Sequence, residues 1–327
     1  MLNYLVRRTL YGVLILIGVN LATFYLFFTV NTPDDMARLN IGGKRVTQEL
    51  IEKWKGERGY DKPLYWNAPK EGSEKLTETI FWERSISLFT FKFGRADSES
   101  AGDIGTEVAR RMWVSIQLAL PIFILQVIAS VSFALLLVMF RHTRLDLAGV
   151  VFCVVMLSIS ALFYIIVGQY LFARVLKLVP SSGYAGGLDV LRFLVLPVLL
   201  SVFARLGTEA RLYRAMFLEE IGKDYVRTAR AKGLSETVVM FRHVLRNAMI
   251  PIITSAGGYL PIVFLGSLVF ESFFGIPGLG AYVIEAISRQ DFAIVRTMVF
   301  VGSALYIASY ILIDIAYTWV DPRVRLA

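Results

Sequence analysis

Long apolar runs alternate with shorter polar segments along most of this 327-residue chain. Six runs approach the ~20 residues that a helix needs to cross a bilayer. They cover residues 9–30, 114–139, 147–172, 190–206, 249–271 and 297–319. This pattern predicts an all-α polytopic membrane protein with six transmembrane helices, of which the fourth has the shortest apolar core.

The longest polar segment, residues 31–112, separates the first run from the second and predicts a large loop. Its Lys/Glu-rich part predicts a helix from about Thr47, which suits an N-cap, to Arg58, closed by Gly59. The aromatic part "TIFWERSISLFTFKFG" favours a folded cap or interfacial element over a flexible linker. Two roles stay open for this loop: a small subdomain without ligand contact, or docking of a substrate-binding protein.

A charged segment interrupts the apolar pattern between the fourth and fifth runs and predicts a short two-faced helix. One face gathers apolar and small residues, namely Tyr225, Val226, Ala229 and Gly233. The other face carries Asp224, Arg227, Thr228 and Ala231. Asp224 suits the helix N-terminus, while Arg230 and Lys232 suit its C-terminus. Gly233 is suited to the left-handed position that ends a helix.

A second helix is expected directly after this one, with Ser235 as its N-cap. In it, Val238, Phe241 and Leu245 are expected to lie opposite Arg242, His243 and Arg246. The first helix, at about nine residues, is shorter than the ~12–15 needed for marginal stability in isolation. We therefore expect an external partner to hold it.

Composition and charge support a membrane protein and set its orientation. Hydrophobic residues make up 56% of the chain, more than a soluble domain of this size carries. The basic residues that flank the runs are Arg7, Arg8, Arg141, Arg144, the cluster from Arg205 to Arg246, Arg323 and Arg325. The cytoplasmic flanks of membrane spans carry an excess of Lys and Arg. Both termini are therefore expected in the cytoplasm and the 31–112 loop outside it.

Two other interpretations of the charge and of the first run are disfavoured. The net charge of +8 is dispersed along the flanks of the runs, and no nucleic-acid-binding module is recognisable. The first run is longer than the apolar core of a signal peptide and ends at "VNTPDD" without a small-residue cleavage site. We expect it to be an uncleaved span.

Catalytic and cofactor motifs are missing from the sequence. It has no phosphate-binding Gly-x-x-x-x-Gly-Lys-Ser/Thr loop, so ATP hydrolysis is not expected in this chain. The segment "GIPGLG" has the wrong glycine spacing for a dinucleotide site. The histidines, His142 and His243, accompany basic segments and suit no metal site or triad. The single cysteine, Cys153, lies within a run and is expected to pack there.

Asp314 is the carboxylate that the pattern places well inside a span, where an ionisable group is a functional candidate by default. It shares a helix face with Tyr317 and Asp321. The structural interpretation is an ion pair with Arg205 or Arg211. The functional alternative is a secondary transporter that uses an ion gradient through Asp314. A membrane enzyme is disfavoured because no nucleophile and base, or metal set, is visible.

The segment "DYVRTARAKGLSETVVMFRHVLRNAMIPIIT" resembles the coupling-helix region of inner-membrane permeases from binding-protein-dependent ABC importers, in the dipeptide/oligopeptide/nickel subfamily. The start of the chain, "FESFFGIPGLGAYVIEAISRQDF" and "DIAYTWVDPRVR" are similar to the same family. The permease motif Glu-Ala-Ala-x-x-x-Gly is present with Arg227 for the acid, and with Ala229 and Gly233 kept. The second span opens on "WVS" where the subfamily has Pro-x-Thr.

This resemblance implies the permease subunit of an ATP-driven importer for peptides or related small solutes, a transporter and not an enzyme. Its implied partners are a second homologous permease subunit, two cytoplasmic ATPase subunits that bind ATP and Mg, and an extracytoplasmic solute-binding protein. The implied site is the ATPase-coupling segment between the fourth and fifth spans. It comprises Asp224, Tyr225, Arg227, Thr228, Ala229, Arg230, Ala231, Lys232, Gly233 and Leu234. Neither metal ligands nor substrate-binding residues are predicted.

The chain is accordingly expected to have three parts, in a bacterial inner membrane. Residues 1–30 form an N-terminal transmembrane helix, and residues 31–112 form an extracytoplasmic loop or cap. Residues 113–327 form a five-helix permease core with the cytoplasmic coupling helix near 224–234.

Overall fold

The computed structural model describes residues 2–42, 46–98 and 102–320. Within these ranges the chain is helical, with a single isolated bridge between Arg95 and Asp103 and no sheet. The predicted all-α class is therefore confirmed for the described residues. The predictions for Asp321, Arg323 and Arg325 lie outside them, as does the side chain of Tyr317.

The described residues fall into two compact units, the first made of 2–113 with 278–308 and the second of 114–277 with 309–320. The helices of the first unit are α1 (Leu2–Tyr25), η1 (Leu26–Val30), α2 (Pro33–Ile41), α3 (Gln48–Arg58), α4 (Glu74–Thr77), α5 (Ile80–Arg84), η2 (Ile86–Thr90) and α15 (Leu279–Ser288). Both α6 (Ile104–Met139) and α16 (Phe292–Val320) begin in the first unit and continue into the second.

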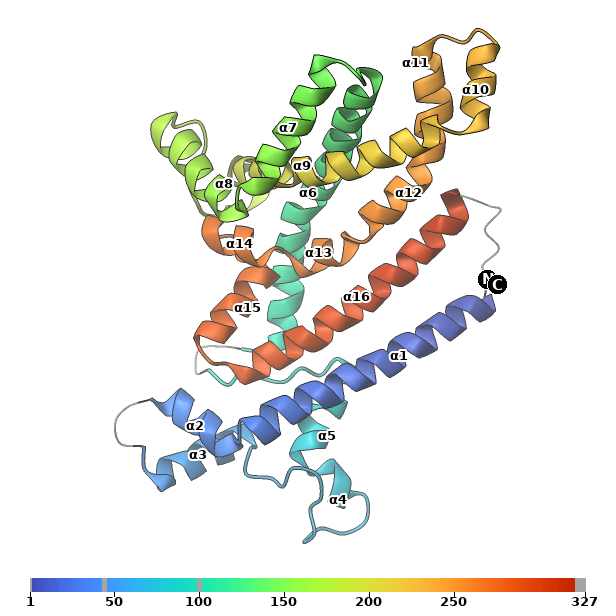
Figure 1. Ribbon diagram of the computed structural model, residues 1–327. Coiled ribbons are helices and arrows are strands. Elements are labelled where there is room, and N and C mark those ends of the chain that lie inside the picture. The colour runs from blue at the N-terminus through green and yellow to red at the C-terminus, as the bar shows by residue number, and fades with distance from the viewer. Residues whose placement is uncertain (1, 43–45, 99–101, 321–327) are drawn as a thin grey trace. The chain divides into compact units, whose positions relative to one another are not determined.

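The second unit holds the remaining helices, drawn from green to orange in Figure 1. They are α7 (Arg144–Ser158), α8 (Ala161–Gly168), η3 (Gln169–Val175), η4 (Gly187–Asp189), α9 (Val190–Ile221), α10 (Asp224–Ala231), α11 (Glu236–Val238), η5 (Val239–Val244), α12 (Leu245–Gly257), α13 (Leu260–Leu265) and α14 (Leu268–Phe274). Two of these elements, η3 and η5, are π-helical, and so is η1 of the first unit.

The long loop after the first span is folded, and its predicted helix is confirmed. The helix α3 runs from Gln48 to Arg58 after Thr47, and Gly59 closes it with a φ of 69°. It lies beside α2, whose start is fixed by a capping box between Thr32 and Asp35 (Figure 1). Buried apolar side chains from this loop and from the end of the first span form one cluster. Its members are Phe24, Phe28, Met36, Ala37, Ile51, Trp54, Tyr60 and Ile80.

The described residues contain between four and six candidate membrane spans. Four helical stretches among the described residues are long and apolar enough to cross a bilayer: Val6–Val30, Ile104–Met139, Val190–Ile221 and Phe292–Ile315. The count reaches six only if each of two bent helix pairs is one span. The helix α6 starts at Ile104, within the segment that was expected to form the loop.

The predicted third and fifth spans are bent helix pairs and not single helices. The first pair, Arg144–Ser158 and Ala161–Val175, bends by 90° where Ile159 is extended and the Ser160 hydroxyl accepts from the Leu162 amide at 3.3 Å. The second pair bends by 49° where Gly257 and Gly258 precede a proline in the first turn of α13. Serine caps, glycine pairs and proline are the usual causes of such breaks.

The helices α7 and α9 cross closely in the second unit. Arg214 of α9 donates two hydrogen bonds to the Asp146 carboxylate at the start of α7, at 3.0 and 2.8 Å. About two turns away from this ion pair, Gly207 faces the Cys153 backbone. Cys153 is buried there beside Leu137, as expected for a packing residue. The close approach depends on Gly207 having no side chain.

Candidate functional site

The segment between α9 and α12 forms a helical elbow, as the sequence predicts. The helix α10 runs from Asp224 to Ala231, and the backbone at Gly233 is left-handed, with a φ of 77°. The Gly233 amide donates to the Arg230 carbonyl at 2.9 Å, which closes the helix. In Figure 1 the helix α10 lies beside the helix that α11 begins and η5 continues, and α10 contacts η5. We call residues 223–238 the elbow.

The inner face of α10 is held by the chain itself, which corrects the expectation that only a partner holds this helix. Val226 and Ala229 are buried against the adjoining helices. The side chains around them are Tyr213, Phe217 and Ile221 of α9, and Val239, Met240 and Val244 of η5. Burial of a valine side chain contributes roughly 1.5–3 kcal/mol and so offsets part of the cost of forming so short a helix.

Two polar contacts fasten the ends of α10. At its start, the Tyr225 hydroxyl donates to the Glu220 carboxylate at 2.5 Å, and Glu220 also pairs with Lys223. Burial and then the Glu220 hydrogen bond raise the pKa of Tyr225 to about 12, so the phenol stays protonated as a donor. At its end, Arg230 donates to Glu236 through two nitrogens, at 3.0 and 2.6 Å. These contacts fix the orientation of the helix.

The outer face of α10 and the turn after it are open to solvent. The exposed residues are Asp224, Arg227, Thr228, Ala231, Lys232, Gly233 and Leu234. The side chains of Asp224 and Arg227 are 96% and 74% exposed. Of the predicted coupling residues, Ala229 is buried, while Tyr225 and Arg230 are half-buried. The three inward residues can therefore act on a partner only by positioning the exposed ones.

The second helix of the elbow follows Ser235, its predicted N-cap, and its first helical residue is Glu236. Val238 and Phe241 are 38% and 50% exposed, whereas the neighbouring Val239, Met240 and Val244 are buried. Leu245, the third residue of the predicted apolar face, is half-buried against the same cluster. The side chains that pack inward from η5, which is π-helical, are thus the neighbours of the predicted face.

A cavity of about 400 Å³ lies within the second unit, at residues for which the sequence analysis predicted no site. Side chains of α6, α9, α13 and α14 line it, among them Gln126, Ser201, Arg205 and Glu209. Glu209 is 2% exposed, and its Oε1 accepts a hydrogen bond from the Tyr259 hydroxyl. The guanidinium of Arg205 lies 4.5 Å from the centre of the Tyr259 ring.

Three polar atoms in this cavity have no hydrogen-bond partner among the described residues. They are Gln126 Oε1, Ser201 Oγ and Glu209 Oε2. The amide nitrogen of Gln126 donates to Ser130 at 2.8 Å, which leaves its oxygen turned to a different side. A buried acceptor without a donor costs roughly 1–3 kcal/mol, so three together point to missing donors.

Buried carboxylates inside the helices are more numerous than the sequence analysis expected. Asp314 is buried, but Glu209 and Glu271 are buried as well, with 2% and 0% exposure. The Ser115 hydroxyl donates to Glu271 at 2.8 Å. Glu209 was missed because the fourth apolar run was ended at residue 206, although α9 continues to Ile221. The pairing of Asp314 with Arg205 or Arg211 stays a prediction.

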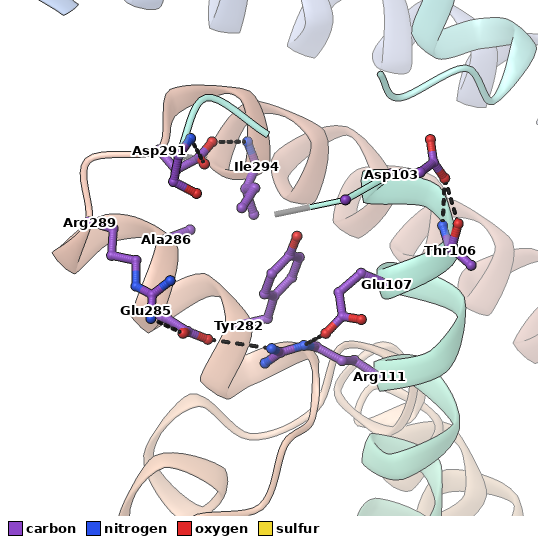
Figure 2. Close-up of a pocket in the computed structure, with 12 residues that line it drawn as sticks. Asp103, Thr106, Glu107, Arg111, Tyr282, Glu285, Ala286, Arg289, Asp291 and Ile294 are labelled. Carbon is purple, nitrogen blue, oxygen red and sulfur yellow. Dashed lines mark hydrogen bonds and ion pairs between the residues drawn. The ribbon is translucent and has the colours of Figure 1, made fainter. Parts of the chain in front are cut away.

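A second polar pocket, of about 420 Å³, lies in the first unit between the start of α6 and α15. Figure 2 shows Arg111 reaching from α6 toward Glu285 of α15. Arg111 pairs with Glu107 and, at 3.5 Å, with Glu285, and its guanidinium lies 4.4 Å from the Tyr282 ring centre. Since these charges already neutralise one another, the pocket suits a clamp between two helices better than a ligand site.

The loop beside this pocket is fixed by a buried carboxylate pair. Asp291 accepts from the Ser98 and Ile294 amides at 2.9 and 3.1 Å. Asp97 accepts from the Tyr60 hydroxyl at 2.9 Å and from the Ala293 amide at 3.0 Å. Burial and the nearby Asp291 raise the pKa of Asp97. Among the described residues, no group of three or more histidine, cysteine or acidic side chains could hold a metal ion.

Comparison with known families gives two matches that together cover nearly the whole chain. Residues 110–326 match the model of the binding-protein-dependent transport system inner membrane component. Residues 1–71 match the model of the N-terminal part of such membrane components. The elbow and the cavity both lie within the first of these matches.

Individual relatives are similar over most of their length. A Brucella abortus permease protein named for a peptide transport system is 31% identical over 326 residues, 98% of this chain and 98% of the relative. The dipeptide transport system permease protein of Bacillus subtilis is 31% identical over 251 residues, 77% of this chain and 80% of the relative. The glutathione transport system permease protein of Escherichia coli K12 is 29% identical over 325 residues, 99% of each chain.

Proposed function

This chain belongs to the family of inner membrane components of binding-protein-dependent transport systems, and from that premise we propose that α10 couples it to an ATPase. The chain is a transport permease subunit of an ABC importer and not an enzyme. ATP and Mg are bound by separate partner subunits in this proposal. The ion-gradient alternative through Asp314 gains no support from the relatives.

The observation that carries the proposal is the division of α10 into a fixed face and a free one. Val226 and Ala229 anchor the helix, whereas Arg227, Thr228 and Ala231 stand open to solvent. An amphipathic helix that leaves a polar face and a small-residue turn exposed suits a groove on a soluble protein. Because α10 is short, a partner that grips this face moves the whole helix at once.

The contacts of α10 give such a movement two routes to the other helices of the second unit. Tyr225 and Lys223 bind Glu220 near the end of α9, so a shift of α10 passes to α9. Val226 packs in the cluster that includes Val239 and Met240, so the same shift passes through η5 to α12. The bent helix pairs can then change angle at their breaks without breaking helical hydrogen bonds elsewhere.

The substrate class follows from the relatives alone. The Bacillus and Escherichia relatives are named for dipeptide and glutathione transport, and glutathione is itself a small peptide. We propose that this chain passes peptides or related small solutes delivered by an extracytoplasmic binding protein. The complete importer would contain a second homologous permease and two ATPase subunits. Uptake of a labelled peptide by the reconstituted complex tests this point.

The proposed orientation places the elbow in the cytoplasm and the 31–112 loop outside. The proposal keeps the division into an N-terminal helix (1–30), an extracytoplasmic loop (31–112) and a permease core (113–327), with both termini cytoplasmic. The folded loop offers a rigid surface for the binding protein, since Trp54 and Tyr60 stack in its core, their ring centres 5.5 Å apart.

Thiol labelling tests the orientation and the coupling role together. Cys153 is the single cysteine and is buried, so Cys153→Ala gives a background in which Ala231→Cys or Lys53→Cys is the sole thiol. We expect an impermeant maleimide to label Ala231→Cys in inside-out vesicles only, and Lys53→Cys in right-side-out vesicles only. Addition of the ATPase subunits is expected to slow labelling of Ala231→Cys about tenfold or more, because a bound surface excludes the reagent.

The control in this experiment is Lys53→Cys, which lies on α3 and is expected to keep its labelling rate when the ATPase binds. Labelling of Ala231→Cys from the outside would overturn the orientation. Unchanged labelling after the ATPase has bound would overturn the coupling role of α10 while leaving the family assignment intact.

A further inference from the structure

The cavity of the second unit contains buried acceptor atoms without donors, and these atoms describe its missing ligand. Gln126 Oε1 and Glu209 Oε2 can only accept hydrogen bonds, and neither has a donor among the described residues. Glu209 in addition carries a negative charge when ionised. A group that supplies several N–H donors and a positive charge would satisfy this site, and a protonated amine supplies both.

The positions of the polar residues along α9 suit an elongated ligand. Ser201, Arg205 and Glu209 follow one another at intervals of four residues, so they form a stripe on one side of the helix. The stripe is ~12 Å long at a rise of ~1.5 Å per residue. Three extended peptide residues span about 10–11 Å, so a short peptide matches this length.

The charge of Arg205 lies in the middle of this stripe, between Ser201 and Glu209. Its guanidinium lies over the Tyr259 ring, and no ion pair joins it to a carboxylate within the described part of the chain. Glu209 and Arg205 are therefore unpaired opposite charges on the wall of one cavity. The cavity volume of about 400 Å³ lies within the ~300–1,000 Å³ typical of small-molecule pockets.

A purely structural role explains these residues less well. A buried carboxylate kept only for stability is expected to have its acceptors satisfied by the protein. Glu271 meets that expectation more closely, since the Ser115 hydroxyl and the Ser267 amide both donate to its Oε1, at 2.8 and 3.2 Å. Glu209 accepts from Tyr259 through Oε1 and lies beside the Tyr213 hydroxyl, but its Oε2 has no hydrogen-bond partner among the described residues and faces the cavity.

We propose that Glu209 binds the protonated amino terminus of a peptide inside this cavity, with Tyr259 holding the carboxylate in place. This inference rests on the proposed function, because it assumes that peptides reach the cavity. Glu209 thereby determines specificity for substrates with a free amine. Gln126 and Ser201 accept hydrogen bonds from the same substrate further along the stripe.

Equilibrium binding to the purified, fully assembled complex tests the proposal. The probes are radiolabelled trialanine and N-acetyltrialanine, which differ in the charged amine. For the wild type we expect acetylation to weaken binding about tenfold or more, as for loss of a charged hydrogen bond. Glu209→Gln is expected to weaken trialanine binding by the same factor and to leave N-acetyltrialanine binding within about twofold, because carboxylate and amine form one interaction.

The matched control is Glu219→Gln, which removes a carboxylate from an exposed position of the same helix and is expected to bind both probes like the wild type. If Glu209→Gln does not assemble, Glu209→Asp keeps the charge, and a reduced preference for trialanine supports the proposal. Equal weakening of both probes, or no change in either, overturns it. Peptide uptake by the wild-type complex is measured separately, and its absence would overturn the proposed function instead.

Discussion

Arg227→Glu is expected to reduce ATP-driven uptake by the assembled importer to below about a tenth of the wild-type rate. Arg227 stands on the outer face of α10 with 74% of its side chain exposed, so it lies where a partner would contact the helix. A partner surface that complements Arg227 is acidic, so reversal of the charge would place like charges together at the proposed interface and cost several kcal/mol. A loss of only ~1.4 kcal/mol already weakens binding tenfold. The measurement is uptake of labelled peptide, together with recovery of the ATPase on the purified permease.

Lys53→Glu is the matched control for this prediction. Lys53 is 73% exposed on α3 and has a weak helical partner, Glu57 at 4.0 Å, much as Arg227 has Asp224 at 3.5 Å. The two charge reversals therefore disturb their own helices to a similar degree. We expect Lys53→Glu to keep ATPase binding. If Arg227→Glu also retained full ATPase binding and uptake, α10 would not be the coupling element.

The sequence was sufficient to predict the elbow because several independent signals agreed there. The apolar face of Val226 and Ala229, an acid at the start and Gly233 at the end each favoured the same short helix. The helix α3 was predictable for the same reason, with Thr47 before it and Gly59 after it. Where an N-cap residue, a helical spacing of apolar residues and a terminal glycine coincide, the local chain has few alternatives to a short helix.

The broken spans could not be predicted from hydropathy, because an apolar run looks the same whether its helix is straight or bent. The 90° break at Ile159 depends on Ser160 capping a new helix, and single serines are common in straight membrane helices. The π-helical turn η5 had no sequence signal at all. Nor did any pattern indicate that the packed side chains of this turn are Val239, Met240 and Val244.

The cavity was missed for a different reason, which concerns residues distant in sequence. Glu209 lies beyond the apolar run that was assigned to the fourth span, among Arg205, Arg211 and Arg214. A carboxylate surrounded by arginines in sequence suggests a solvated surface. In the fold, Arg214 turns to Asp146 and Arg205 to Tyr259, so Glu209 is left facing a cavity. Only tertiary packing separates these charges.

Gly207→Val is expected to leave most of the expressed protein molecules unfolded, because residue 207 lies where α7 and α9 cross closely. A Cβ atom at residue 207 would lie 2.6 Å from the Cys153 carbonyl oxygen and 3.0 Å from the Met156 Cβ. The first of these is a backbone atom, so no side-chain rotation relieves the contact. Overpacking commonly costs 1–3 kcal/mol, and a clash with backbone lies at or above the upper end of that range.

Gly18→Val separates this effect from the general consequence of a β-branched residue in a membrane helix. Gly18 lies in α1, and a Cβ atom there would meet no heavy atom within 4 Å. We expect Gly18→Val to be recovered in wild-type yield with an unchanged melting temperature in detergent, and Gly207→Val to be lost or to melt at least several degrees lower. Equal stability of the two variants would contradict the close crossing. Because α9 carries both Glu209 and the Glu220 contact to α10, separation of α7 from α9 would disturb the cavity and the elbow together.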